Sequence, residues 1–574
     1  MSTSLRQLYE SKGDWEKVVR TMRRRMEAAD DEERFALLVS TGDVLMQRLG
    51  DKPMASKSYV AALEIKADDR NLLTKLMAVY SENKDWSRLV EVILRIAELV
   101  DDSRQLAKYY NTAAAICHYE LNRPSEAADY YEQALEHDAT VGKSFEGLVA
   151  ALNAEKDWER LEEVYRARIK RAGDGDPKEL ANLWDQLGDL LLHRLEKKSD
   201  ATEALEQAQR IDPGNRRRGE QLAEIYSGEP KRFYQKAVKI HGDLLAINPY
   251  RIESYQALRK LYTDVKKPDE SWCVCQALTV LKSAEPDEES FFKKHRRREP
   301  AGATDVMTPE LWAKHVTHPE QDALLTDIFA LITPAALATR SQPLAGFGLD
   351  AAKKRNPEKD EADMARTLHY AAGVTGIALP DVYYRKDDPG GLSVVFSNPP
   401  AIGLGKGALA GGPAQALAFV GGRHLSYLRP GHYLRMLVPT GSGLRAWLLA
   451  AIKSAVGQFP VPKELASSVD EHLAAFKKHL SGPQQETLRS LVQRLLSAAP
   501  ELDLKKWVAM VDLTADRAGF ILANDLEIAT AVVRASPDDA AGLPQKERLK
   551  ELHLYAVSED YLALRHKLGI AIGG

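Results

Sequence analysis

The residues from Trp184 to Leu191 read Trp-Asp-Gln-Leu-Gly-Asp-Leu-Leu, and Ala201, Leu205, Ala208 and Pro213 follow them at fixed offsets. Small residues at Gly188, Ala201 and Ala208 allow two antiparallel helices to approach closely, while Leu187 and Leu205 fill the space between them. Pro213 cannot continue a helix and therefore ends the second one. The stretch predicts a tightly packed pair of helices.

The same spacing recurs through the N-terminal half of the chain, which indicates an internal repeat. The recurrences are Ala55, Tyr59, Ala62 and Ala67; Ala127, Tyr131, Ala134 and Ala139; and Ala237, His241, Leu244 and Pro249. Between them lie Asp14-Trp15, Asp85-Trp86 and Asp157-Trp158, at nearly equal intervals. We interpret each aspartate as a helix N-cap, and each interval as two repeats of about 34 residues.

Together, these positions resemble the tetratricopeptide repeat, with Trp184, Leu187, Gly188, Ala201, Leu205, Ala208 and Pro213 as its packing residues. The resemblance implies an α-solenoid over residues 1–284 whose concave surface binds segments of other proteins. A helical bundle without a groove is the alternative. Because Met1 stands almost directly before a repeat helix, we expect the array to pair with another copy or to continue in a longer chain.

Composition favours a protein of several domains that binds neither nucleic acid nor membrane. The chain has 574 residues, of which 44% are hydrophobic and 28% charged, and its net charge is only −4. The least polar window, 401–422, is interrupted by Lys406, Pro413 and seven glycines, so we expect no membrane span. Three cysteines and an N-terminus without an apolar signal region lead us to expect a cytoplasmic location.

The repeat pattern fails after residue 284. Residues 285–304 combine proline, glycine and the basic run 293–298, which predicts a charged, solvated linker between the array and a second domain at 305–574. Within that domain, the turn 387–391 separates two runs rich in Val, Tyr and Phe, at 380–384 and 392–400, and predicts a β-hairpin. The glycines of 403–407 do not have the spacing of a phosphate-binding loop.

An apolar helix is predicted between Pro413 and Pro430, because its first charge is Arg423. A later helical stretch contains Asp512-Leu513-Thr514-Ala515-Asp516. With the strands before them, these two stretches resemble the M48-like zincin metallopeptidases, in which His-Glu-x-x-His and a later Glu-x-x-Ala-Asp form the zinc site. The resemblance implies a mainly α chain: a solenoid followed by an α+β zincin-like domain with a small hairpin sheet.

The resemblance places Arg423 and Tyr427 at the positions of the two histidine ligands. His424 takes the position of the catalytic glutamate, Asp512 that of the third ligand, and Asp516 that of the supporting aspartate. Zinc hydrolysis needs imidazole and carboxylate ligands and a glutamate base. We therefore expect a pseudoenzyme without metal or other cofactor, in which Arg423 pairs with Asp512 or Asp516.

Two functions from different classes follow. The first is a non-catalytic scaffold that binds partner proteins through the repeat array, with the pseudo-peptidase domain as a second binding surface. The alternative is a metal-dependent hydrolase with the unusual ligands His424, His432 and Asp512, since histidine is the commonest metal ligand. The position of His424 on the helix, about 100 degrees from its neighbours, disfavours this alternative.

Overall fold

The computed structural model describes residues 2–173, 175–498, 503–536 and 543–573. The chain forms two compact units, Met1–Arg218 and Gly219–Gly574, and α13 (Arg216–Gly228) contains the boundary between them. Each unit is helical, and the second unit also holds a small sheet.

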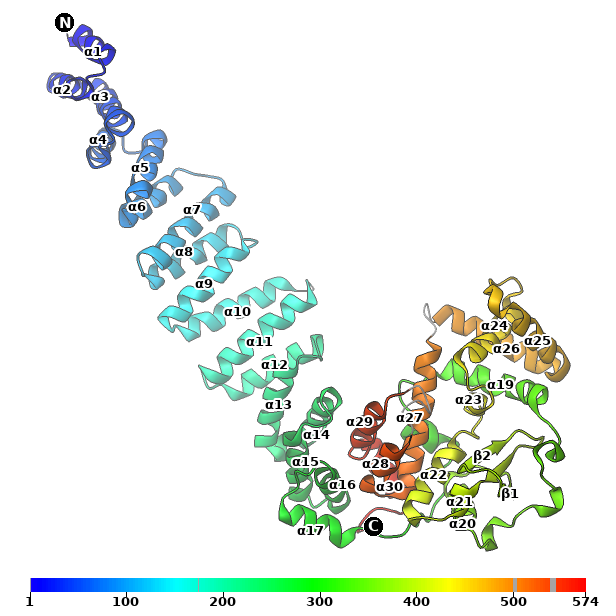
Figure 1. Ribbon diagram of the computed structural model, residues 1–574. Helices are drawn as coiled ribbons and strands as arrows, with labels where there is room; N and C mark the ends of the chain where they lie inside the picture. The colour runs from blue at the N-terminus through cyan, green and yellow to red at the C-terminus, as the bar shows by residue number, and fades with distance from the viewer. Residues whose placement is uncertain (1, 174, 499–502, 537–542, 574) are drawn as a thin grey trace. The chain divides into compact units, whose positions relative to one another are not determined.

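In the first unit, consecutive helices pack against one another along the chain (Figure 1). They are α1 (Ser2–Ser11), α2 (Trp15–Met26), α3 (Asp31–Val44) with η1 (Leu45–Leu49), α4 (Lys52–Ile65), α5 (Arg70–Asn83), α6 (Trp86–Ala97), α7 (Ser103–Ala115) with η2 (Ile116–Glu120), α8 (Pro124–His137), α9 (Gly142–Glu155), α10 (Trp158–Ala172), α11 (Pro177–His193) and α12 (Lys198–Ile211). We call the odd-numbered helices of this series first helices and the even-numbered ones second helices.

The predicted N-caps are confirmed. The side chains of Asp14, Asp85 and Asp157 accept hydrogen bonds from the backbone N–H groups three residues later. Each aspartate thus satisfies a donor that has no partner within the helix, and each following tryptophan is the first helical residue. This local chemistry sets where α2, α6 and α10 begin.

The packing residues of the decisive stretch lie between α11 and α12. Leu187, Ala201, Leu205 and Ala208 are fully buried, and Trp184 is half-buried against the same core. A Cβ atom added at Gly188 would lie 2.7 Å from a side-chain methyl of Leu205, so only glycine permits this approach. Helix α12 ends at Ile211, two residues before Pro213.

Polar contacts join the first helices of neighbouring pairs. Lys75 Nζ donates to Asp43 at 2.6 Å between α5 and α3, and Ser144 Oγ donates to Asn111 at 2.8 Å between α9 and α7. Arg218 of α13 lies 2.6 and 2.8 Å from the two carboxylate oxygens of Asp185 of α11. The partners are 32 or 33 residues apart in each case, so the contact repeats with the helix pairs.

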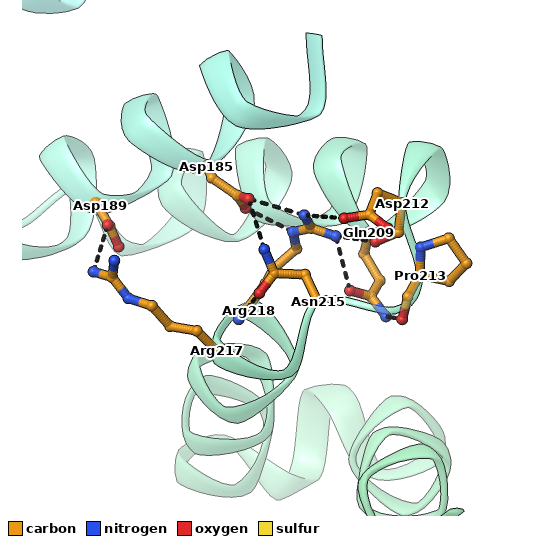
Figure 2. A network of polar contacts seen from close by, with 8 residues as sticks. All are labelled: Asp185, Asp189, Gln209, Asp212, Pro213, Asn215, Arg217 and Arg218. Atoms are coloured by element: carbon orange, nitrogen blue, oxygen red, sulfur yellow. Dashed lines mark hydrogen bonds and ion pairs between the residues drawn. The ribbon is translucent and has the colours of Figure 1, made fainter. Parts of the chain in front are cut away.

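Figure 2 shows the third of these contacts within its network. Arg218 is only 1% exposed and also contacts the side chains of Gln209 and Asp212 at the end of α12. The neighbouring Arg217 donates to Asp189 at 2.7 Å. The buried guanidinium of Arg218 is therefore paired from two helices, which fixes the start of α13 against α11 and α12.

The second unit contains the last repeat-like helices and the C-terminal helices. Its α-helices are α14 (Pro230–Ile247), α15 (Ile252–Asp264), α16 (Pro268–Val280), α17 (Pro286–His295), α18 (Pro309–Leu311), α19 (Ala323–Arg340), α20 (Asp363–Thr375), α21 (Lys406–Leu409), α22 (Ala414–Ser426), α23 (Tyr433–Leu437), α24 (Gly441–Val456), α25 (Ala466–His479), α26 (Gly482–Ala498), α27 (Leu504–Ala523), α28 (Leu526–Ala535), α29 (Gln545–Tyr555) and α30 (Glu559–Lys567). The π-helical turn η3 (Trp312–Val316) continues α18.

The division of the chain differs from the predicted one. Residues 286–295, within the predicted linker, form α17, because Pro286 and a capping box of Glu285 and Glu288 start a helix there. Phe292 of α17 is buried, and Arg296, from the run predicted to be solvated, pairs with Asp525 at 2.6 Å. The segment is therefore packed against its unit.

Buried polar contacts join α16 to the C-terminal helices. Arg565 of α30 donates to both carboxylate oxygens of Asp269 at 2.8 Å, and both residues are 1% exposed. The backbone N–H of Leu526 at the start of α28 donates to Gln276 at 2.7 Å. These contacts explain why the last repeat-like helices share a compact unit with residues 305–573 rather than with the first unit.

The predicted hairpin is wrong in its pairing. The strands β1 (Asp381–Tyr384), β2 (Leu392–Val395) and β3 (Ala401–Leu404) form a mixed sheet in the order β1-β3-β2. Strand β3 pairs parallel with β1 and antiparallel with β2, so it lies between the two expected partners. Every residue of β3 is buried, which gives this short run of Ala, Ile, Gly and Leu the central position.

One described helix, α19, is long and apolar enough to cross a membrane by length and composition. It differs from the least polar window of the sequence, 401–422. Its residues Leu325, Ile328 and Phe329 are buried in a core shared with Trp447 and Trp507. The apolar composition of α19 thus also serves packing within the second unit.

Candidate functional site

The candidate site lies where α22 packs against α27. A Cβ atom at Gly422 would lie 3.0 Å from the carbonyl oxygen of Ala518, and one at Gly519 would lie 2.6 Å from that of Phe419. The two glycines therefore bring the helix backbones into direct contact. This close approach places the side chains of Arg423 and Tyr427 beside those of Asp512 and Asp516.

Asp516 is the centre of the site. It is fully buried, and Arg423 Nε donates to its Oδ1 at 2.7 Å, which confirms the predicted pairing. Arg548 of α29 also donates to it, with Nε 2.7 Å from Oδ2 and Nη2 2.8 Å from Oδ1. Both oxygens of the carboxylate are thus bonded to guanidinium groups, and neither is left to act as a base or a ligand.

Asp512 lies one turn away and is bound differently. Tyr427 Oη donates to its Oδ1 at 2.6 Å and accepts a hydrogen bond from Arg423 Nη1 at 3.1 Å. Burial raises the pKa of Tyr427 well above its usual value, so the phenol keeps its proton for this bond. Burial also raises the pKa of Asp512, and its Oδ2 lies 3.6 Å from Arg435 Nη2.

The two histidines of the alternative metal site do not join this cluster. His424 is buried, and its Nε2 has no hydrogen-bond partner among the described residues. His432 Nε2 instead faces the side-chain amide of Gln321 at 2.9 Å. Burial lowers the pKa of His424 to about 4 and that of His432 to about 3, so both are neutral at pH 7.

Within the described ranges, no group of three or more His, Cys, Asp or Glu side chains is placed to hold a metal ion. The three positions that the zincin resemblance assigns to zinc ligands instead carry an arginine, a tyrosine and an aspartate, which form one hydrogen-bonded cluster with Asp516. Chemically, this arrangement neutralises charge and holds α22, α27 and α29 together.

Sequence reasoning found Arg423, Tyr427, Asp512 and Asp516 but missed Arg548 and Arg435. Arg548 lies on α29 and Arg435 on α23, and neither belongs to the stretches that carry the resemblance. The available signal was an excess of buried acid: a helix as apolar as α27 cannot bury two aspartates without cationic partners from elsewhere.

Comparison with known proteins shows similarity in the repeat region. Residues 3–34 match the family model of the tetratricopeptide repeat. No curated protein matches the chain. Among solved structures, YrrB, described as a TPR protein with an unusual peptide-binding site, is 16% identical; the match covers 33% of this chain and 92% of that one, with a TM-score of 0.24.

Two further structures are similar at the same level. The TPR2AB domain of yeast Sti1, solved as a pHSP90 complex, is 15% identical; the match covers 46% of this chain and 98% of that one, with a TM-score of 0.22. PilF of Pseudomonas aeruginosa is 18% identical; the match covers 39% and 97%, with a TM-score of 0.21. The family match thus covers one helix pair, α1 and α2, and further helix pairs follow it along the first unit.

Proposed function

We propose that this chain is a non-catalytic scaffold whose repeat array binds segments of partner proteins. Tetratricopeptide repeats generally mediate protein–protein interaction, because stacked helix pairs present long continuous surfaces. We assign binding to the face of the first helices, where Lys108 of α7 and Glu146 of α9 are exposed. The proposal places the protein in the cytoplasm.

We further propose that the C-terminal domain is a degenerate zincin-like fold that serves as a second binding surface. The observation that supports it best is the bonding at the three ligand positions of the resemblance. A zinc site needs imidazoles and an acid that are free to coordinate, whereas Arg423 binds Asp516 and Tyr427 donates to Asp512 at 2.6 Å. In this proposal the positive charge of the Arg423 guanidinium replaces the positive charge that a zinc ion would supply.

Metal content tests the second part of the proposal. We expect purified protein to hold less than one zinc per chain by elemental analysis, and we expect EDTA to leave its melting temperature unchanged. A tightly held equivalent of zinc, together with a lower melting temperature after chelation, would instead support the hydrolase.

Partner capture tests the first part. We expect the double variant Lys108→Glu and Glu146→Lys to lose the partners that the full chain captures from its host. The matched control is Lys170→Glu, an exposed charge reversal on the second helix α10. Capture that survives the first-helix substitutions as well as it survives the control would move the binding surface elsewhere.

A further inference from the structure

Two grooves in the first unit are built in the same way. The first groove, of about 510 Å³, lies between the second helices α4 and α6, and α5 forms its base. The second groove, of about 220 Å³, lies between α8 and α10, with α9 at its base. The first is lined by Val60, Leu63, Glu64, Ala67, Leu73, Leu76, Tyr80, Arg88, Glu91, Val92 and Arg95.

The residues that line the second groove lie 72 positions after those that line the first, as Leu135 lies after Leu63. Ten of the eleven positions that line the first groove line the second as well, and seven of them keep the same residue. The seven pairs are Leu63 and Leu135, Glu64 and Glu136, Ala67 and Ala139, Leu76 and Leu148, Arg88 and Arg160, Glu91 and Glu163, and Val92 and Val164.

The grooves are more alike than the helices that carry them. Among the other 38 positions from 52 to 100, only eight keep their residue at the same interval. Most of those eight have a role in the fold, such as the buried Tyr59 and the N-cap Asp85. The exposed Glu64 and Glu91 have no such role, because they are neither packed nor capping.

The two shared arginines are already paired inside the protein. Arg160 binds both carboxylate oxygens of Glu132, at 2.8 and 2.6 Å, and also Asp129 at 2.8 Å. Arg88 lies 3.3 Å from Asp85. The arginines thus shape the grooves, and their charge is at least partly compensated before any ligand arrives.

The four shared glutamates are placed differently. Glu64, Glu91, Glu136 and Glu163 are exposed, and none forms an ion pair with another residue that the structure describes. Each groove therefore offers two free carboxylates beside apolar Leu, Leu and Val side chains. The grooves also contain arginines that they do not share, Arg95 in the first and Arg168 and Arg171 in the second. The shared glutamates are the groups in both grooves that can bind a cationic group attached to an aliphatic one.

We propose that the two grooves are two copies of one docking site, which binds a partner-protein segment carrying the same short motif twice. Each motif has an aliphatic side chain for the apolar base and a lysine or arginine on each side for the two glutamates. This inference rests on the proposed scaffold function. It adds a binding surface within the repeat array that is formed by the second helices rather than by the first helices.

Bivalent peptide binding tests this proposal. The probes are a peptide with one Lys-Leu-Lys motif and a series with two such motifs joined by Gly-Ser linkers of increasing length, titrated into the full chain. Because the second contact is intramolecular, we expect the best two-motif peptide to bind at least about tenfold more tightly than the one-motif peptide.

The substitutions are matched between the grooves. Glu64→Gln with Glu91→Gln, or Glu136→Gln with Glu163→Gln, should reduce the two-motif peptide to the affinity of the one-motif peptide, and all four together should abolish binding. Glu155→Gln, an exposed glutamate that lines neither groove, is the control. Melting temperatures equal to that of the parent chain show that the variants are folded.

Equal affinity for one-motif and two-motif peptides, or binding unaffected by the four substitutions, would overturn the proposal. Self-association that the four substitutions abolish would assign the grooves to a second copy of the chain and would overturn it too. If the peptides fail while partner capture still depends on Lys108 and Glu146, the groove proposal falls and the scaffold proposal stands.

Discussion

Arg548 binds both carboxylate oxygens of Asp516, with Nε and Nη2 at 2.7 and 2.8 Å, and both residues are almost fully buried. The contact joins α29 to α27, whereas Arg423 joins α22 to the same carboxylate. A single aspartate of α27 therefore binds two helices, α22 and α29, that are not its neighbours along the chain.

The first prediction concerns that aspartate. Asp516→Ala leaves the buried guanidinium of Arg548 without its partner, so we expect a loss of about 3–5 kcal/mol in the free energy of unfolding, measured by urea denaturation. Asp470→Ala, which removes the exposed pair with Lys453, should cost no more than about 1 kcal/mol. Similar losses for both variants would contradict the central role of Asp516.

The second prediction concerns pH. Because the pKa of His432 is lowered from 6.5 to about 3 on folding, the unfolded chain binds the proton first as the pH falls. His432 therefore contributes stability above pH 6.5, and this contribution decreases progressively between pH 6.5 and about 3. Unfolding free energies of the parent and His432→Gln should run parallel above pH 6.5 and diverge as the pH falls from 6.5 to 4.5, by up to about 1.4 kcal/mol per pH unit. Parallel curves would contradict the assignment.

The third prediction concerns the contact of α11 with α12. Gly188→Ala places a Cβ atom 2.7 Å from Leu205, so we expect a loss of about 1–3 kcal/mol in the stability of the repeat array. Gly142→Ala, at the start of α9, meets no atom within 4 Å and should be neutral or slightly stabilising.

A double variant checks that overpacking is the cause of the loss. Leu205→Ala removes the methyl groups that the new Cβ atom would meet, so it should cost less stability in the Gly188→Ala background than in the parent chain. Thermal unfolding of the parent, the two single variants and the double variant measures this difference. Additive effects would show that the alanine at position 188 acts in another way.

The fourth prediction concerns the buried pair of Asp269 and Arg565. Arg565→Met leaves an unpaired buried carboxylate and should destabilise the second unit by about 3–5 kcal/mol. The double variant Arg565→Met with Asp269→Leu removes both charges and should recover most of that loss. A double-mutant cycle with additive effects would show that the pair does not couple α16 to α30.

Local chemistry could be predicted from the sequence, and long-range pairing could not. The caps at Asp14, Asp85 and Asp157 depend on neighbours three residues away, so spacing alone identified them. The partner of Arg423 followed because the zincin resemblance aligned α22 with α27. The position of β3 depends on its parallel pairing with β1. Strand β2 lies between these two strands in the sequence but not in the sheet, and no turn signal specifies that arrangement.

The packing of α17 was also missed, for a physical reason. The charges of 285–298 were interpreted as exposure to solvent, but Arg296 is compensated by Asp525 and Glu527 at the start of α28. A charged run is solvated only when no distant acid meets it, and a single sequence does not show those partners.

The burial of α16 decides how this protein can be dissected. Ten consecutive residues, 269–278, are buried, including Trp272, which could not all be covered by the preceding repeat alone. A fragment that ends at residue 284 would expose this helix to solvent, and we expect it to aggregate even if its earlier repeats fold. Fragments that are meant to test binding by the two parts separately should instead divide the chain near residue 218. Helix α16 then stays in the same fragment as the C-terminal helices that cover it.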